Sequence, residues 1–589
     1  MKKINGRMLR MTALCASLSL LSACGGGGGE GGAPGTPTGS ATGTLTDSPV
    51  AGVQYTTSSG VTGFTNAEGK FTYQPGDTVT FKIGGLTLGT VTAAGSDATI
   101  TPLQIAESVG GLSEGQKQNL VTNLLVLLQS LDSDGDAANG ISIATTTAAA
   151  LTSTTAAALD LAADPVAFSA DADLIGLLGT AGLNQDPVDP ADALLHFKTQ
   201  FLKDLAGVYT LDLGDNQVIA FRFNSDGSYL MAEVATADGA GQPGIERGRI
   251  DWDPLTGEIL TANVTFDTNG EWGLSHMVAE KLYLSLNGET LAVRVDAADP
   301  DSDETLQFSR LNSGSGIVGP WALNSYGVPA ASLSVQQFLF LGNGKYLMID
   351  PVGDDDYAEP DDPKCGDAGL EYGSYTLAGG VLTASAIIAD TNGCAGLYDN
   401  VAEAYSSFDS VVVDSVTGTV SAGDETLLVR PDTSTLVYAG QAEVTATTTG
   451  TPVSQEGGAY TLFCSPGEEV GDMYPLEALF TFNAEAGTFA MVRTDEGALV
   501  EVAGTYNAAT GAMSWQENEE RRIVMDTGSV VFYTEEQTVY TATYDIESDS
   551  VTGGWTDTRT TSWDRDGSEV SCTADVEFSV TTTAPSAPL

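Results

Sequence analysis

The sequence predicts a mainly β, multidomain protein with a small β-sandwich, a helical connector and three tandem antiparallel β-barrel or sandwich repeats. Three observations support this fold class. The 589 residues exceed what one hydrophobic core usually organises. The second half is rich in Thr and in scattered aromatic residues, and 69 glycines mark turns along the chain. Ordered motifs also recur from residue 205 onward, which is typical of tandem modules.

The first element is an export signal at residues 1–23, with a basic start, a short apolar stretch and small residues before Cys24. The sequence LSAC at 21–24 resembles the lipobox of bacterial lipoproteins. That resemblance implies cleavage before Cys24, diacylglycerol on its thiol and acylation, for example by palmitate, of the new amino group. Gly25 in place of Asp implies the outer membrane. The alternative is an ordinary signal peptide with a chance cysteine.

Residues 24–42 form a Gly-rich tether, and residues 43–100 then alternate apolar and polar side chains between turn signals. This alternation predicts a β-sandwich. The ordered sequences PVAGV at 49–53, GFT at 63–65 and GKFTY at 69–73 resemble the transthyretin-like, carboxypeptidase-regulatory-like module of surface proteins.

Residues 101–204 change character and predict a helical connector, because leucines recur at helical spacing across 120–131 and a second run at 193–205 follows Pro190. After the first run, Asp132, Asp134 and Asp136 alternate along a turn. Alternate carboxylates on a turn suit calcium, although the sequence departs from an EF-hand loop. The alternative is a solvated turn that ends the helix.

Two β-meander repeats are predicted at 205–312 and 313–432. Their motifs match in order: FRF at 221–223 with FLF at 338–340, DGSYLM at 226–231 with NGKYLM at 343–348, GIERG at 244–248 with GLEYG at 369–373, and DTNG at 267–270 with DTNG at 390–393. Each copy is long enough for about eight short strands. The order of the matches indicates duplication of one β-unit.

A diverged third repeat is predicted at 455–580, from FTFN at 480–483, GTF at 487–489 and GTY at 504–506. It lacks the DTNG element. A type I turn closed by a left-handed Gly is predicted at 253–257, 414–418, 507–511 and 549–553. The pattern resembles lipocalin-like or streptavidin-like meanders in architecture only, and it leaves barrel and sandwich open.

Four cysteines remain in the mature body, two inside the second repeat and two near the ends of the third. In an oxidising compartment they predict two disulfides, Cys365 with Cys394 and Cys464 with Cys572. Each would contribute about 2–4 kcal/mol. No CxxC spacing is present to favour a metal site instead.

Catalytic candidates are few. The chain has two histidines, His196 in an apolar helical run and His276 outside any nucleophile elbow, and both are expected to be structural. Metalloprotease, Walker and dinucleotide motifs are absent from the sequence. A carboxylate hydrolase remains an alternative, since 78 acidic residues allow many pairs.

The net charge of −55 disfavours nucleic acid as a partner. Membrane contact is expected through the lipid on Cys24. We therefore expect a surface-anchored, non-enzymatic binding or adhesion lipoprotein with an unidentified surface ligand, no cofactor unless calcium binds, and specificity in unshared loops such as 354–363. A carrier with an apolar ligand in a barrel lumen is the alternative in the binding class.

Overall fold

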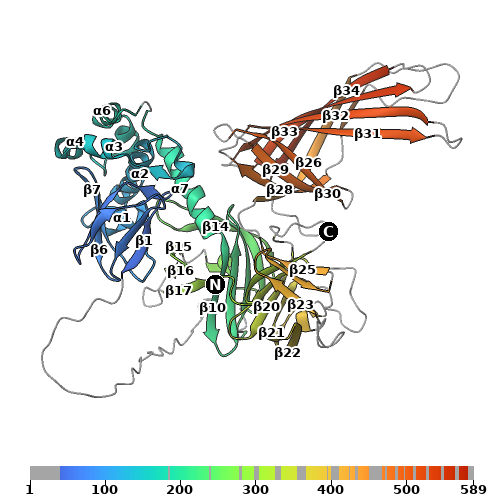
Figure 1. Ribbon diagram of the computed structural model, residues 1–589, viewed down its shortest axis with the longest axis horizontal. Helices are drawn as coiled ribbons and strands as arrows, with labels where there is room; N and C mark the ends of the chain where they lie inside the picture. Colours follow the sequence, from blue (N-terminus) through green and yellow to red (C-terminus); the bar gives the residue numbers. More distant parts are fainter. Residues whose placement is uncertain are drawn as a thin grey trace, which may run out of the picture.

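The computed structural model describes residues 40–581, apart from 184–185, 238–240, 278–280, 297–303, 325–332, 334, 354–366, 394–395, 399–409, 424, 432–435, 450–466, 471–473, 484–487, 496–497, 508–511, 525–529, 546–549 and 564–568. These residues form several β-sheets and a group of helices, which confirms the mainly β, multidomain fold class (Figure 1). No helix in this part combines the length and apolar character needed to cross a membrane.

The predicted small β-sandwich is present. Its two sheets have the orders β5 (Lys70–Tyr73), β1 (Ala41–Leu45), β8 (Thr99–Ile100) and β4 (Thr62–Phe64), β3 (Gln54–Thr57), β6 (Thr78–Ile83), β7 (Leu86–Thr92). Side chains alternate between buried and outward positions along β1, β3, β5 and β6. Phe71 packs edge-on against Phe81 with ring centroids 5.2 Å apart, so aromatic rings fill the space between the sheets.

Helices follow the sandwich: α1 (Pro102–Ser108), α2 (Glu114–Ser130), α3 (Thr145–Ala150), α4 (Ser153–Ala158), α5 (Pro165–Ser169), α6 (Ala172–Ala181) and α7 (Pro190–Leu205), with a 3-10 turn at Ala137–Asn139. The parallel pair β2 (Val50–Ala51) and β9 (Ile141–Ser142) ties them to the sandwich. Ser113 and Gln116 form a capping box at the start of α2, and Pro190 occupies the first turn of α7. The predicted leucine run lies buried on α2.

Barrel 1 has the strand order β14-β13-β12-β11-β10-β17-β16-β15. The strands that come first and last in the sequence, β10 and β17, therefore pair with each other. The strands are β10 (Gly207–Gly214), β11 (Gln217–Phe223), β12 (Ser228–Val234), β13 (Gly244–Trp252), β14 (Ile259–Asp267), β15 (Leu282–Asn287), β16 (Thr290–Val295) and β17 (Glu304–Arg310), with α8 (Leu274–Met277) between β14 and β15. An isolated bridge from Glu258 to Tyr283 draws the remaining edges together. The sheet is therefore a nearly closed barrel.

Barrel 2 repeats this topology strand for strand, as β22-β21-β20-β19-β18-β25-β24-β23. Its strands are β18 (Gly319–Leu323), β19 (Gln337–Phe340), β20 (Lys345–Asp350), β21 (Gly369–Ala378), β22 (Val381–Asp390), β23 (Val411–Asp414), β24 (Thr419–Ala422) and β25 (Glu425–Val429). The shared order agrees with the duplication that the motifs indicate.

Barrel 3 is closed, because β26 pairs with both β28 and β34. Its strands are β26 (Leu436–Thr449), β27 (Gly467–Val470), β28 (Tyr474–Asn483), β29 (Thr488–Asp495), β30 (Ala498–Tyr506), β31 (Ala512–Val524), β32 (Val530–Asp545), β33 (Ser550–Trp563) and β34 (Glu569–Thr581). The strand that closes the barrel thus begins at Leu436, ahead of the predicted start at 455. Sequence matching missed it because it carries none of the repeated motifs.

One cross-strand pair is common to the three barrels: Tyr229 opposite Gly248, Tyr346 opposite Gly373 and Phe489 opposite Gly504. A Cβ atom at these glycines would lie 3.1, 2.8 and 2.5 Å from the opposing ring. Each glycine therefore lets an aromatic ring lie against the neighbouring backbone. The common register supports the third unit as a copy of the same meander.

Barrels 1 and 2 pack through corresponding outer surfaces, named here the homologous faces. One cluster of buried side chains joins Val218, Ala220, Leu230, Ala232, Val234 and Ile245 to Leu339, Leu341, Leu347, Ile349, Leu370 and Tyr372. Strands β11 and β12 are consequently buried on both sides, with one side toward the lumen and the other toward barrel 2. The two barrels form an internal pair.

The predicted turns agree with the structure in two of four places. Gly257 and Gly418 have φ of +76° and +69°, and their N–H groups donate to the carbonyls of Asp253 and Asp414. The turn predicted at 549–553 is wrong, because Gly553 lies inside β33 opposite Ala542. Pairing of β33 with β32 and β34 makes residues 550–553 part of a strand instead of a turn. The turn at 507–511 falls largely outside the described residues.

Candidate functional site

Most of the predicted covalent sites lie outside the described residues. These are the lipidation site Cys24 and the disulfide candidates Cys365, Cys394 and Cys464, together with the acidic loop at 354–363. Cys572 lies on β34, but its side chain is not described. Lipidation and both disulfides therefore stay predictions.

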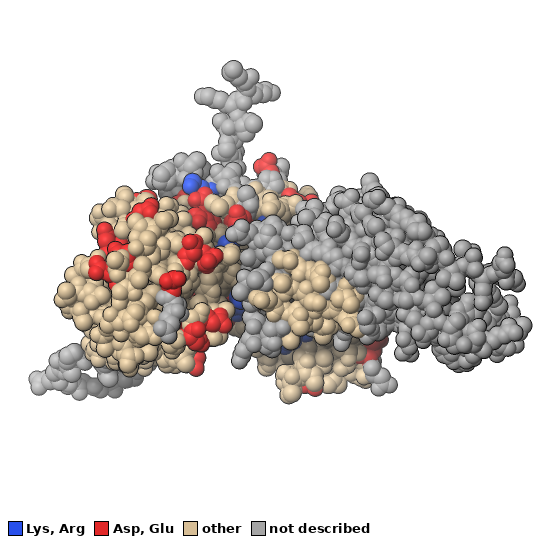
Figure 2. Space-filling model, turned by 90° about the horizontal axis from the view of Figure 1, so that it is seen from above, with Lys and Arg blue, Asp and Glu red and all other residues tan. Residues whose placement is uncertain are grey.

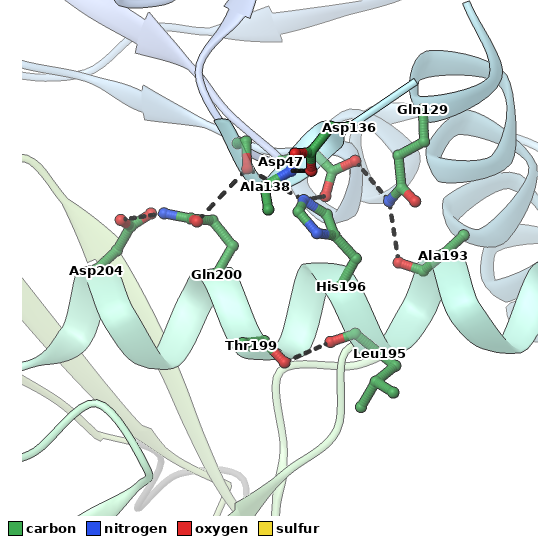
Figure 3. Close-up of polar contacts among 11 residues, drawn as sticks. Asp47, Gln129, Asp136, Ala138, Ala193, Leu195, His196, Thr199, Gln200 and Asp204 are labelled. Atoms are coloured by element: carbon green, nitrogen blue, oxygen red, sulfur yellow. Dashed lines mark hydrogen bonds and ion pairs between the residues drawn. The ribbon is translucent and has the colours of Figure 1, made fainter. Parts of the chain in front are cut away.

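The structure brings His196 into a buried polar cluster where the sandwich meets the helices (Figure 3). His196 lies on α7, Asp47 and Ser48 follow β1, and Gln129 lies on α2. Nε2 of His196 is 3.1 Å from Oγ of Ser48 and 3.9 Å from Oδ1 of Asp47. Gln129 donates to Oδ2 of Asp47 at 2.9 Å and to the Ala193 carbonyl at 3.1 Å. The cluster ties three segments together.

Burial dominates the electrostatics of this cluster. The side chain of Asp47 is 0% exposed, and burial raises its pKa to about 8, although the Gln129 hydrogen bond lowers it in part. Burial also lowers the pKa of His196 to about 4, and Lys203 lowers it further. At neutral pH both side chains are therefore mainly uncharged.

The cluster contains Ser, His and Asp, yet it does not have the geometry of a catalytic triad. In a triad the carboxylate bonds to one imidazole nitrogen and the serine to the other. Here Ser48 and Asp47 both face Nε2 of His196. A low imidazole pKa also makes His196 a poor base at neutral pH. The arrangement instead suits a structural polar contact.

The three aspartates of the calcium prediction lie close in sequence but play different roles. Asp132 is buried and accepts a hydrogen bond from the Ser142 backbone at 2.7 Å. Asp134 accepts from the Asp136 backbone and from Asn139. Burial raises the pKa of Asp132 to about 6. The hydrogen bond between the Asp132 and Asp134 side chains lowers the pKa of Asp134. Among the described residues, no group of three or more His, Cys, Asp or Glu side chains is arranged to hold a metal ion.

A cavity of about 420 Å³, named here the junction cavity, lies beside the cluster. The β-sandwich, α1, α7 and barrel 1 all contribute to its wall, and Asp47 lines it. Its aromatic side is Phe197, Phe201, Trp252 and Tyr283, and Phe201 stacks on Trp252 with ring centroids 3.8 Å apart. Sequence analysis missed this cavity because its wall is formed by segments that lie as much as roughly 250 residues apart in the sequence.

The lumens of barrels 1 and 2 are filled by side chains. In barrel 1, Phe221 packs on Phe308 with ring centroids 5.2 Å apart. In barrel 2, Phe340 packs on Tyr375 at 4.8 Å, and Trp321 and Tyr346 are fully buried. The interior of each of these two barrels is therefore a packed hydrophobic core.

A buried tyrosine–glutamate pair recurs in the first two barrels, which sequence analysis did not single out. Tyr229 donates to Glu246 at 2.6 Å, and Tyr346 donates to Glu371 at 2.5 Å. Glu246 also accepts the Leu274 N–H at the start of α8. Barrel 3 has Phe489 and Val502 at the matching register positions. The sequence does contain a sign of this pair, because Gly-x-Glu recurs at 244–246 and 369–371. In barrel 1, the glutamate of this motif anchors the start of α8.

Comparisons with known proteins give little information about this chain. No family model and no curated protein matches the sequence. Among solved structures, it is similar to a double mutant of the vaccine antigen Transferrin Binding Protein B from Haemophilus parasuis Hp5, with 9% identity, a TM-score of 0.13 and coverage of 62% of this chain. The chain spans 65% of that protein, which is less than two thirds. A TM-score this low supports no conclusion about fold or function.

Proposed function

We propose that this chain is a non-enzymatic binding lipoprotein of the outer membrane, anchored through a lipid on Cys24. The LSAC sequence at 21–24 supports the anchor, and the Gly-rich tether at 24–42 would hold the folded modules away from the bilayer. The acidic composition favours protein or small-molecule partners over nucleic acid. On the face drawn in Figure 2, acidic side chains greatly outnumber basic ones.

The observation that carries this proposal is the filled interior of barrels 1 and 2. A carrier of the lipocalin type needs an open lumen, whereas Phe221, Phe308, Phe340 and Tyr375 occupy these interiors. In barrels 1 and 2, binding then falls to surfaces and loops, and the junction cavity lies beside barrel 1. Packing through the homologous faces orients the two barrels relative to each other. A paired platform of this kind suits recognition of an extended surface partner.

The hydrolase alternative has less support. A carboxylate hydrolase needs two acids that converge on one substrate bond, and no described pair of acids carries a specific signal for that role. A serine hydrolase at Ser48 is disfavoured as well, because Ser48 and Asp47 both face Nε2 of His196. The proposal therefore assigns binding and no turnover to the mature chain.

The test compares three strains: wild type, a deletion strain and a strain expressing Cys24→Ala. We expect lipid labelling and outer-membrane fractionation to be lost in Cys24→Ala, and surface attachment to fall in both altered strains. Cys15→Ala, within the leader, is the matched control and should process normally. Unchanged labelling in Cys24→Ala would refute the anchor, and robust turnover of hydrolase substrates by the purified protein would refute the binding assignment.

A further inference from the structure

The junction cavity has an unbalanced wall. Acidic residues lining it are Asp47, Asp97, Glu107, Asp204 and Glu289, and the lining bases are Lys70 and Arg294. Both bases are engaged already. Lys70 donates to Thr44 at 2.7 Å and lies 4.0 Å from Asp97, while Arg294 pairs with Asp296 and lies over the Tyr283 ring. Asp47 is mainly uncharged at neutral pH, and Glu289 lies 3.5 Å from Arg310. The unbalanced negative charge of the cavity therefore lies at Glu107 and Asp204.

Three of the lining carboxyl groups, those of Asp47, Glu107 and Asp204, form no direct ion pair with a Lys or Arg of the described residues. Glu107 and Asp204 are exposed at the rim, on α1 and α7, and surrounding protein atoms still raise the pKa of each. Longer-range attraction partly offsets this effect, because Arg294 lowers the pKa of Glu107 and Arg310 lowers that of Asp204.

Asp47 lies deeper and is fully buried. Asp47 and Asp204 each accept one hydrogen bond, from Gln129 and Gln200, but no ion pair with a described Lys or Arg would compensate a charge on either carboxyl group. A carboxylate in such surroundings is stabilised when a cation binds beside it.

Two buried polar atoms in the wall of the cavity are unpartnered. Oδ1 of Asp47 accepts no hydrogen bond, since its nearest donor, Nε2 of His196, is 3.9 Å away. Nε1 of Trp252 has no acceptor, although the residue is 1% exposed. Buried donors and acceptors are normally satisfied. The wall thus holds one carboxyl oxygen and one indole N–H group that no described residue satisfies.

The wall also indicates what kind of cation fits. The described residues provide no cluster of three or more metal-binding side chains, so the carboxyl groups do not converge on one ion. Phe197, Phe201, Trp252 and Tyr283 instead give the wall a large aromatic component. A volume of about 420 Å³ falls in the usual range of small-molecule sites, about 300–1,000 Å³. Aromatic rings beside carboxylates are suited to an organic ammonium group.

We propose that the junction cavity binds a small organic cation, an aliphatic diamine, with its two ammonium groups at the rim carboxylates of Glu107 and Asp204 and its carbon chain against the aromatic side chains. Thr44, Thr99 and Thr101 line the same cavity and offer hydroxyl acceptors for further ammonium hydrogens. This site is separate from the surface binding proposed above. It would also link the sandwich, α7 and barrel 1 through one ligand.

Calorimetric titration of the full mature chain with cadaverine tests the proposal, with 1,5-pentanediol as an uncharged probe of the same chain length. We expect one saturable site for cadaverine and none for the diol. The double variant Glu107→Gln/Asp204→Asn should weaken cadaverine binding by about tenfold or more. The control Glu271→Gln/Asp192→Asn removes the same charges from exposed positions that do not line the cavity and should leave affinity within about twofold.

Absence of saturable cadaverine binding to the wild type would overturn the proposal, as would equal binding of the diol. Equal weakening by both double variants would also overturn it, because the effect would then come from net charge alone. The rim residues are exposed, so melting curves of the two double variants should coincide. Surface attachment is measured without added amine, so failure of cadaverine binding leaves the test of the lipoprotein proposal intact.

Discussion

The buried carboxyl group of Asp47 should make the folded protein less stable as the pH rises. Burial raises its pKa from 3.8 to about 8. Between these values the folded protein keeps a proton that the unfolded chain has lost, so the free energy of unfolding falls with pH. The contribution of the protonated group is fully present below pH 3.8 and is lost as the pH rises through 8.

His196 acts in the opposite direction at lower pH. Burial lowers its pKa from 6.5 to about 4, so its contribution is present above pH 6.5 and is lost as the pH falls through 4. The two slopes oppose each other below pH 6.5, and the range from 6.5 to 8 isolates Asp47. Across that range the protein should lose about 1.5 kcal/mol, since each pH unit is worth about 1.4 kcal/mol until the group half-titrates.

The perturbation is Asp47→Asn, which keeps the shape and an acceptor for Gln129 but cannot ionise. Urea unfolding of the full mature chain at several pH values measures the difference between variant and wild type, so the other modules cancel. The gap should widen in favour of the variant by about 1.5 kcal/mol between pH 6.5 and 8. Asp192→Asn, on the exposed side of α7, is the control and should run parallel to wild type.

Parallel pH profiles for Asp47→Asn and wild type would refute this reasoning, because they would mean that Asp47 is already ionised in the folded state. Infrared difference spectra offer a second measurement. The wild type at neutral pH should show a protonated carboxyl band that is missing in the variant. Absence of that band would place the pKa of Asp47 below neutral and contradict the burial argument.

Further predictions concern the disulfides, the acidic turn and the repeated buried pair. Non-reducing peptide mapping should find two disulfides, each within one repeat: Cys365 with Cys394 and Cys464 with Cys572. Free thiols or crossed pairs would contradict this prediction. If the turn at 132–136 binds calcium, excess chelator should lower the melting temperature, and unchanged melting would favour the solvated turn. Tyr229→Phe should cost about 1–3 kcal/mol by removing a buried donor to Glu246, whereas a cost near zero in urea unfolding would show that the pair is dispensable.

Local patterns predicted most of the elements. The alternating residues of the sandwich, the leucine run in α2 and the start of α7 at Pro190 depend on neighbours within a few residues, and the structure has each of them. Ordered motifs were enough to align barrels 1 and 2 as copies of one unit, but not to decide how their strands pair. The first strand of barrel 3, Leu436–Thr449, was missed because barrel closure is a long-range pairing with β34.

Local spacing was misleading at 549–553. The DSVTG sequence there equals the one at 414–418, where Gly418 does take the left-handed conformation. In barrel 3, the last four of these residues, 550–553, lie in the long strand β33, where they pair with residues of β32 and β34. Cross-strand hydrogen bonds from distant residues outweighed the local turn preference.

Composition and local order by themselves determined the fold class, the duplication of the first two β-units and the positions of two main helices, and they predict the export signal. Those features follow from side-chain periodicity and short motifs, which need no knowledge of distant contacts. Only the tertiary structure decided that two barrels pack through their homologous faces, that Asp47, Gln129 and His196 meet, and that a cavity opens beside them. Burial causes both the raised pKa of Asp47 and the unmet donor of Trp252, and burial exists only once segments far apart in the sequence have packed together.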